Sequence, residues 1–202
     1  STLFSIFLSN PERRGKLTSI KSIPLIARNL EVKSANNLFF GQEYNSGIET
    51  EEIFQNIYND ANYLAGPDIL GLDNEKSEFY ESFFLWLGVN QDVVLEQKNR
   101  EEYRDYWDYA DFVKKHTKLP EKVTYYSCNK VIKISNINDL GKLDINSVFR
   151  LLIKNQKLFE LVLADAEFNT RYGNEYEKPI ANAPSYIVFQ LNSIFKFSTY
   201  II

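Results

Sequence analysis

The 202-residue chain contains no methionine and a single cysteine, Cys128. One cysteine cannot form a disulfide within the chain, which favours a reducing, cytoplasmic setting. No apolar run approaches the roughly 18 residues that a membrane-spanning helix needs, so no membrane partner is expected. The missing methionine and the start at Ser1 predict a fragment of a larger multidomain protein. The length suits one hydrophobic core, so we expect residues 1–202 to form a single domain.

Positive charge is also in short supply. The chain has 23 Lys and Arg against 27 Asp and Glu, which gives a net charge of −4. Such a chain has no long-range attraction for phosphate backbones, and this argues against nucleic acid as a partner. A basic cluster near the N-terminus keeps a nucleic-acid-contacting domain as the alternative function. Its members are Arg13, Arg14, Lys16 and Lys21.

Recognisable catalytic and cofactor motifs are missing too. Neither a Gly-x-Gly-x-x-Gly nor a Gly-x₄-Gly-Lys-Ser/Thr phosphate loop occurs. The only histidine, His116, follows two lysines at a predicted helix end, a position that the helix macrodipole favours by itself. We therefore predict no catalytic residue, no cofactor and no metal site. An enzyme would need a pocket assembled from distant residues, for which the candidates are Asp165, Glu167, Arg171 and Tyr172.

Three aspartates at a spacing of three raise the question of a metal site. They are Asp105, Asp108 and Asp111. Successive steps of three rotate by about 60° around a helix, so these carboxylates fan out instead of converging on one ion. Arg104 and Lys115 each stand four residues from one of them. This spacing predicts the ion pairs Arg104–Asp108 and Asp111–Lys115 on a solvated helix face.

Aromatic residues, by contrast, are plentiful, with 15 Phe and 13 Tyr. On a helix over the segment 77–90, six large side chains fall within an arc of roughly 160°, which predicts a core face. They are Phe79, Tyr80, Phe83, Phe84, Trp86 and Leu87. A second predicted helix, 98–116, has a similar stripe for the core. Its members are Tyr103, Tyr106, Trp107, Ala110 and Val113.

Two apolar residues stand among polar neighbours on these predicted helices, Leu85 on the first and Phe112 on the second. Misplaced apolar side chains are a hint of a contact surface. We therefore predict that Leu85 and Phe112, with Arg13 and Arg14, meet a partner. That partner is expected to be another domain of the parent protein, or another protein.

The remaining patterns predict a mainly α-helical α+β fold with a few short, antiparallel strands. Residues 23–40 indicate two extended pieces around a turn near Arg28–Leu30, and Lys122–Ser127 with Lys130–Ser135 indicate a hairpin. Four further helices are expected. The first covers Glu49–Tyr58 with Thr50 as its cap, and the second covers Asn74–Leu87 and ends at Gly88. The third covers Asp144–Ala164 with a division near Asn155–Gln156, and the fourth covers Pro184–Asn192 with its cap near Ser185.

Five short motifs also follow one another in order: IPLI, NLFF, FFLWLGVN, LDINSVFRLLIKNQKLFELVL and APSYIVFQL. This order resembles the region downstream of the ATPase domain in large bacterial proteins that carry a sacsin-type, Hsp90-like ATPase. The resemblance covers roughly residues 20–195. The glycine-rich lid motifs of the family's ATP site are absent from this chain, so no catalytic residue is carried over.

The resemblance implies a non-catalytic module of a large intracellular protein with a role in protein quality control or defence against phage. Such a module would transmit nucleotide-driven motion or present a surface to partners. Together with the missing catalytic motifs, it predicts a structural and interaction module of an ATPase-containing protein.

Overall fold

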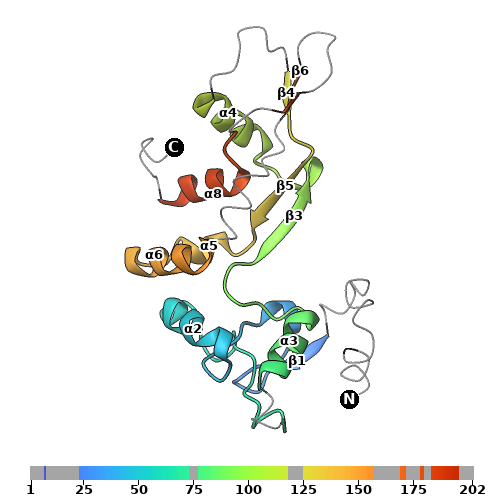
Figure 1. The fold of residues 1–202 in the computed structure, drawn as a ribbon, viewed down its shortest axis with the longest axis vertical. Helices are drawn as coiled ribbons and strands as arrows, with labels where there is room; N and C mark the ends of the chain where they lie inside the picture. Colours follow the sequence, from blue (N-terminus) through green and yellow to red (C-terminus); the bar gives the residue numbers. More distant parts are fainter. Residues whose placement is uncertain are drawn as a thin grey trace. The chain divides into compact units, whose positions relative to one another are not determined.

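The computed structural model describes Phe7 and residues 23–72, 77–117, 125–156, 169–171, 178–179 and 183–195. Contacts divide the chain into two compact units. Unit 1 comprises Ser1–Asp92 with Leu143–Leu151, and unit 2 comprises Val93–Lys142 with Leu152–Ile202. Both units contain helices and short antiparallel strands (Figure 1), which confirms the predicted α+β class. The expectation of a single domain stays a prediction.

A β-hairpin begins the described part of unit 1. Strands β1 (Pro24–Ile26) and β2 (Val32–Ser34) pair antiparallel. Leu30 in the turn has φ 68°, a left-handed conformation that non-glycine residues rarely adopt. Its amide donates to the carbonyl of Ala27 at 2.8 Å and closes the turn. The two extended pieces predicted around this turn are confirmed.

Two helices follow in unit 1, α2 (Ile48–Phe54) and α3 (Ser77–Leu87). Thr50 does not cap α2 as predicted. It is buried inside the helix, and its hydroxyl donates to the carbonyl of Ser46 at 3.4 Å. Gly88 ends α3 as predicted, with φ 103°, a conformation that is open to glycine without steric cost.

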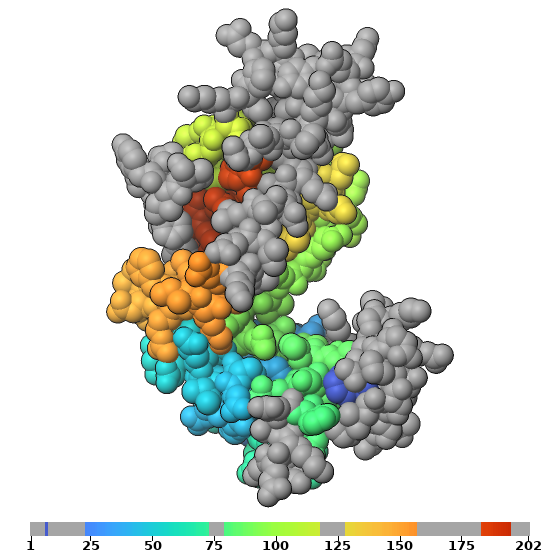
Figure 2. Space-filling view, viewed as in Figure 1, coloured from blue at the N-terminus to red at the C-terminus, as the bar shows by residue number. Residues whose placement is uncertain are grey.

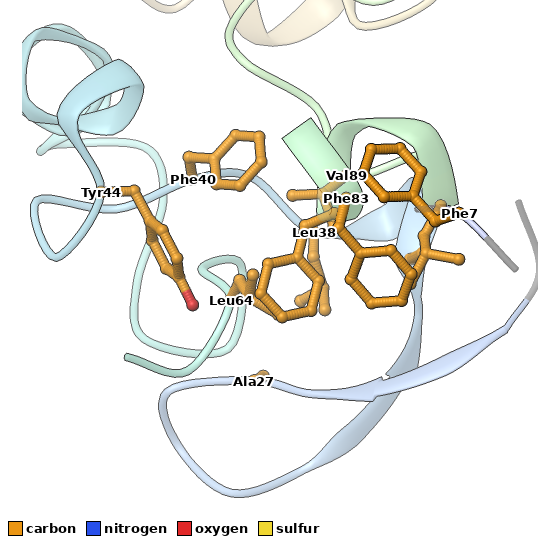
Figure 3. Packing of buried hydrophobic residues seen from close by; sticks show 11 residues of the cluster. Phe7, Ala27, Leu38, Phe40, Tyr44, Leu64, Phe83 and Val89 are labelled. Carbon is orange, nitrogen blue, oxygen red and sulfur yellow. The ribbon is translucent and has the colours of Figure 1, made fainter. Parts of the chain in front are cut away.

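The core of unit 1 gathers side chains from the hairpin, from the segment after it and from α3 (Figure 3). Its buried members are Phe7, Ala27, Ala35, Leu38, Phe40, Tyr44, Leu64, Phe83, Phe84, Leu87 and Val89. The face of α3 in this core is narrower than predicted. Phe79 stands about 80° from the centre of the buried face near Leu87 and is exposed, so its predicted burial is wrong.

In unit 2, a two-stranded ribbon replaces part of a predicted helix. Strand β3 (Leu95–Asn99) pairs antiparallel with β5 (Lys130–Ile134). The helix predicted over 98–116 is therefore wrong in its first part, because Lys98 and Asn99 belong to β3. After a 3-10 turn, η6 (Arg100–Glu102), helix α4 runs over Tyr106–His116.

The predicted hairpin between Lys122–Ser127 and Lys130–Ser135 is also wrong. Strand β4 (Tyr125–Ser127) pairs with β6 (Asn169–Arg171), and β6 pairs in turn with β7 (Lys178–Pro179). The described residues of both predicted segments are extended, as β4 and β5. However, β4 pairs with β6 and β5 pairs with β3, and both partners are far away in the sequence. Sequence proximity therefore did not decide the pairing.

Helix α8 (Tyr186–Phe195) packs against β5 and α4 in unit 2. The Gln190 side chain is buried and bonds the backbone of Ile134 twice. The amide of Ile134 donates to Oε1 at 2.8 Å, and Nε2 donates to its carbonyl at 3.1 Å. The Ser185 hydroxyl accepts the amide hydrogen bond of Val188 at 3.3 Å, which confirms the predicted cap of α8.

Two further helices are α5 (Ile137–Leu140) and α6 (Ile145–Lys154). The Asp144 carboxylate accepts hydrogen bonds from the amides of Asn146 and Ser147, at 2.9 and 3.1 Å, and so caps α6. The regular helix ends at Lys154, beside the predicted division, and residues 157–164 of the predicted helix lie outside the described residues.

No helix in the described part of the chain is long and apolar enough to cross a membrane. The cytoplasmic setting stays a prediction.

Candidate interaction surface

An open pocket in unit 2 lies where η6 passes into α4. Its volume is about 270 Å³. It is lined by Arg100, Glu101, Tyr103, Arg104, Tyr106 and Trp107. Two arginines and an exposed tryptophan give it its character, so we name it the arginine–tryptophan pocket.

Local hydrogen bonds build the backbone under this pocket. Asn99 and Glu102 form a capping box around η6, in which the Asn99 amide donates to Oε2 of Glu102 at 3.2 Å. The amide of Arg100 donates to the carbonyl of Asn129 at 2.8 Å, and the buried Tyr103 hydroxyl donates to the carbonyl of Cys128 at 2.9 Å. The pocket therefore stands on a turn that is fixed at both ends.

Aromatic rings organise the cationic side of the pocket. The guanidinium of Arg100 lies 4.4 Å from the ring centroid of Tyr106 and 5.8 Å from that of Trp107. The Tyr106 and Trp107 rings meet edge to face, with centroids 5.2 Å apart. Such cation–π contacts hold the Arg100 side chain in a defined position.

Trp107 is 66% exposed, so the prediction that it belongs to the buried stripe is wrong. The buried residues of α4 are Tyr106, Tyr109, Ala110 and Val113. On a helix, Trp107 lies about 100° from Tyr106, at the margin of this face. Tyr109 is buried in place of Trp107, and its hydroxyl donates to the carbonyl of Pro184 at 3.0 Å.

The predicted ion pairs of this region do not form. All four of these residues are described, and neither Arg104 and Asp108 nor Asp111 and Lys115 bring a side-chain nitrogen within 4.0 Å of a carboxylate oxygen. Arg104 precedes the first residue of α4, so the geometry of helical neighbours four apart does not apply to it. The Arg104 side chain is exposed and has no carboxylate partner among the described residues.

Unit 1 contains a second charged cluster, built around Arg28. Its guanidinium donates to both carboxylate oxygens of Glu51, at 2.8 and 2.7 Å, to Glu43 at 2.6 Å and to Asp60 at 3.2 Å. It also lies 4.8 Å from the ring centroid of Tyr63. This network ties the hairpin turn to α2 and to two loops.

The electrostatics of the Arg28 network fit a structural role. Hydrogen bonding from Arg28 lowers the pKa of Glu51, and burial raises the pKa of Tyr63 to about 12. A side chain at Gly41 would overlap the guanidinium, so the network is closely packed. We interpret the Arg28 network as a structural element that stabilises unit 1.

The structure places Leu85 and Phe112 differently. Leu85 is exposed on α3, as its position among polar residues predicts. Phe112 is half-buried inside unit 2, with its ring centroid 5.5 Å from that of Phe189 and 4.4 Å from that of His116. A partner role for either stays a prediction, and Arg13 and Arg14 lie outside the described residues.

The other candidates of the sequence do not gather into a site. Cys128 is buried, and its thiol donates to the carbonyl of Lys130 at 3.0 Å. No group of three or more His, Cys, Asp or Glu in the described part could hold a metal ion. Lys16, Lys21, Asp165, Glu167 and Tyr172 lie outside the described residues, and for Arg171 only the backbone is described.

A scan of family models, a search of curated proteins and a search of solved structures each find no match to this chain.

Proposed function

We propose that this chain is a non-catalytic interaction module, and that the arginine–tryptophan pocket binds a segment of a partner protein. The observation that carries this proposal is the exposed Trp107 beside two arginines on a fixed turn. Tryptophan, tyrosine and arginine are the residue types most enriched at the energetic centres of protein interfaces. A large ring exposed on the surface also loses little conformational entropy on binding.

The chemistry of the pocket defines the ligand it favours. Arg104 is an exposed guanidinium that can form two parallel hydrogen bonds to one carboxylate. Trp107 offers an apolar face next to it. The matching segment therefore carries an Asp or Glu beside an aromatic or aliphatic side chain.

The resemblance to sacsin-like proteins supplies the proposed setting. In that setting the segment belongs to another domain of a large ATPase-containing protein of quality control or phage defence. The pocket then helps to position this module against the ATPase-bearing part. A segment of a separate protein would use the same chemistry.

A second candidate function is contact with single-stranded nucleic acid. Bases stack on exposed aromatic rings, and arginines follow the phosphates, so Trp107 with Arg100 and Arg104 favours this reading. Glu101 lines the same pocket, and the chain is acidic overall. These charges repel phosphate, which is why we prefer a protein segment as the ligand.

The test compares two kinds of probe on the whole 202-residue chain. One is a panel of short peptides that pair Asp or Glu with Phe, Trp or Leu, with matched peptides in which Lys replaces the acid. The other is oligo(dT) and oligo(U). Binding is followed by the amide and indole NMR signals.

We expect acidic–apolar peptides to shift the Trp107 indole signal, and the Arg104→Ala and Trp107→Ala variants to lose that binding. Lys114→Ala, an exposed charge change on the same helix, is the matched control and should bind as the original chain does. If no peptide binds, the proposed function is wrong. If only oligonucleotides bind, with affinity falling steeply as salt rises, the second candidate replaces it.

A further inference from the structure

Strand β3 of unit 2 has one edge that no other strand covers among the described residues. It pairs with β5 alone. Its atoms form part of the molecular surface in the space-filling view (Figure 2, green). Two hydrogen bonds just beyond its ends show which residues bond to the β5 side. The amide of Ser135 donates to the carbonyl of Val94 at 2.7 Å, and the amide of Arg100 donates to the carbonyl of Asn129 at 2.8 Å.

The alternation of these bonds fixes the direction of the remaining backbone groups. In an antiparallel pair, every second residue bonds to the neighbouring strand, and the residues between them direct their N–H and C=O groups the other way. Val94 and Arg100 bond on the β5 side, so the backbone groups of Leu95, Gln97 and Asn99 point away from β5. We name the row formed by these three residues the outer edge of β3.

The other side of the ribbon is closed by buried side chains of unit 2. Gln190 bonds both backbone groups of Ile134, and the thiol of Cys128 donates to the carbonyl of Lys130 at 3.0 Å. Ile134 and Lys130 each stand opposite a residue of the outer edge of β3, so these backbone groups point away from β3. The Gln190 amide offers the donor and acceptor of a peptide group and takes the place of a neighbouring strand. This leaves β3 as the edge that can accept another strand.

The outer edge of β3 has no comparable protection in the part of the chain that the structure describes. The outward-pointing backbone groups of Leu95 and Gln97 have no partner among the described residues. Proteins often place lysine on an open edge to keep other strands away. Lys98 belongs to β3, but its ammonium lies 2.5 Å from a carboxylate oxygen of Glu96, which offsets its charge. The edge is therefore accessible to another strand.

The sequence of β3 is complementary to itself in one register. If two copies of β3 lie antiparallel about a two-fold axis at Gln97, Glu96 of each copy stands directly opposite Lys98 of the other. Residues at such a position are a non-hydrogen-bonded pair, with Cα atoms about 4.5 Å apart and side chains on the same face of the sheet. Opposite charges at directly facing positions stabilise a strand pair.

The neighbouring registers match less well. An axis at Glu96 or at Lys98 brings two identical charges together. An axis at Asn99 places Lys98 opposite Arg100, again two like charges. An axis at Leu95 leaves Glu96 without a charged residue opposite it. Like charges at directly facing positions destabilise a strand pair, so the charges of β3 select the first register.

We propose that the outer edge of β3 pairs antiparallel with β3 of a second copy of this chain, with the two-fold axis at Gln97. The two Gln97 residues then exchange both backbone hydrogen bonds, and each Leu95 amide donates to the Asn99 carbonyl of the other copy. The Asn99 amide keeps its bond to Glu102. The ribbons of the two copies thus form one continuous sheet. This contact does not use the arginine–tryptophan pocket, so its failure would leave the proposed function untouched.

Sedimentation equilibrium of the whole chain at low salt tests the pairing. The edge is shorter than a standard interface, so we expect a reversible dimer, with a weight-average mass that rises with concentration. Lys98→Glu and Glu96→Lys should each raise the dissociation constant by about tenfold, because each places like charges opposite each other. Lys114→Glu makes the same charge change at an exposed site of α4. It is the matched control and should associate as the original chain does.

An equal mixture of the two β3 variants separates pairing from folding. In a mixed dimer of Lys98→Glu with Glu96→Lys, every facing pair again has opposite charges. The mixture should therefore associate more strongly than either variant alone. Damage to the fold of either variant would persist in the mixture, so this recovery can come only from the contact between copies.

Cysteine crosslinking tests the register. Gln97→Cys should form a disulfide-linked dimer under mild oxidation, because the Cα atoms of a hydrogen-bonded pair lie about 5.5 Å apart, within the range of a disulfide. Asn99→Cys is the matched control, since Asn99 is also exposed on the same edge. It should crosslink much more slowly, because its two copies stand on opposite sides of the axis.

Four results would each overturn the proposal. The first is a chain that stays monomeric at every concentration. The second is a Lys114→Glu variant that loses as much association as Lys98→Glu. The third is a mixture of the two β3 variants that associates no better than each variant alone. The fourth is an Asn99→Cys variant that crosslinks as fast as Gln97→Cys.

Discussion

Replacing Arg28 with methionine tests whether the Arg28 network stabilises unit 1. The Arg28 side chain is 16% exposed, and the Glu43 and Glu51 side chains are 27% and 22% exposed. Methionine keeps much of the aliphatic volume but removes every hydrogen bond to the carboxylates. Glu43 and Glu51 are then left close together, partly desolvated and without a cation.

The size of the effect follows from this partial burial. Breaking a fully buried ion pair costs about 3 to 5 kcal/mol, and an exposed pair contributes under about 1 kcal/mol. The Arg28 network lies between these limits and includes a two-pronged bond to Glu51. We expect Arg28→Met to lower the free energy of unfolding of unit 1 by about 2 to 3 kcal/mol.

The matched control is Arg150→Met, also in unit 1. Arg150 pairs with Glu52, but these side chains are 45% and 58% exposed. Its replacement should cost less than about 1 kcal/mol. The assay is urea unfolding followed by the fluorescence of Trp86, which packs against Phe83 in unit 1. A Trp107→Phe background removes the signal of unit 2. Equal losses for both arginine variants would refute the argument.

The pH dependence gives an independent check. Arg28 lowers the pKa of Glu51 in the folded chain, so that its contribution to stability is present above the unfolded pKa of about 4.3. The contribution is lost as pH falls through the lower, folded pKa. The difference in unfolding free energy between the original chain and Arg28→Met should therefore be largest near neutral pH and shrink in acid. A constant difference from pH 7 to pH 3 would contradict this cause.

Three further changes have defined outcomes. Gly88→Ala forces a side chain into φ 103° at the end of α3, so urea unfolding of unit 1 should show a loss of about 1 kcal/mol. Tyr109→Phe removes the hydrogen bond to the carbonyl of Pro184, and it should lower the stability of unit 2 by about 1 to 2 kcal/mol in thermal unfolding. Trp107→Ala should change the free energy of unfolding by less than about 0.5 kcal/mol, because an exposed ring stabilises little, and we expect the same variant to lose the proposed peptide binding. A large thermal shift for Trp107→Ala would mean that the ring is part of the core.

The sequence did not predict the arginine–tryptophan pocket, because the pocket depends on where β3 ends and α4 begins. Reading residues 98–116 as one helix placed Trp107 in the core and paired Arg104 with Asp108. The structure ends a strand at Asn99 and starts the helix at Tyr106, so Tyr103 and Arg104 lie outside the helix. The buried face of α4 then centres on Tyr106 and Val113, and Trp107 lies at its margin. The run of Arg100, Arg104 and Trp107 was visible in the sequence. Its common orientation was not, because it depends on the turn at η6.

Local chemistry by itself determined the hairpin around Leu30, the end of α3 at Gly88, the cap of α8 at Ser185 and the α+β class. Each of these depends on residues within a few positions of one another. The tertiary structure alone decided that β5 pairs with β3 and that β4 pairs with β6. A strand edge accepts any backbone of suitable geometry, so its partner is selected by which side chains the rest of the fold buries. The same non-local packing buried Tyr106 and Tyr109 of α4 and left Trp107 outside the core.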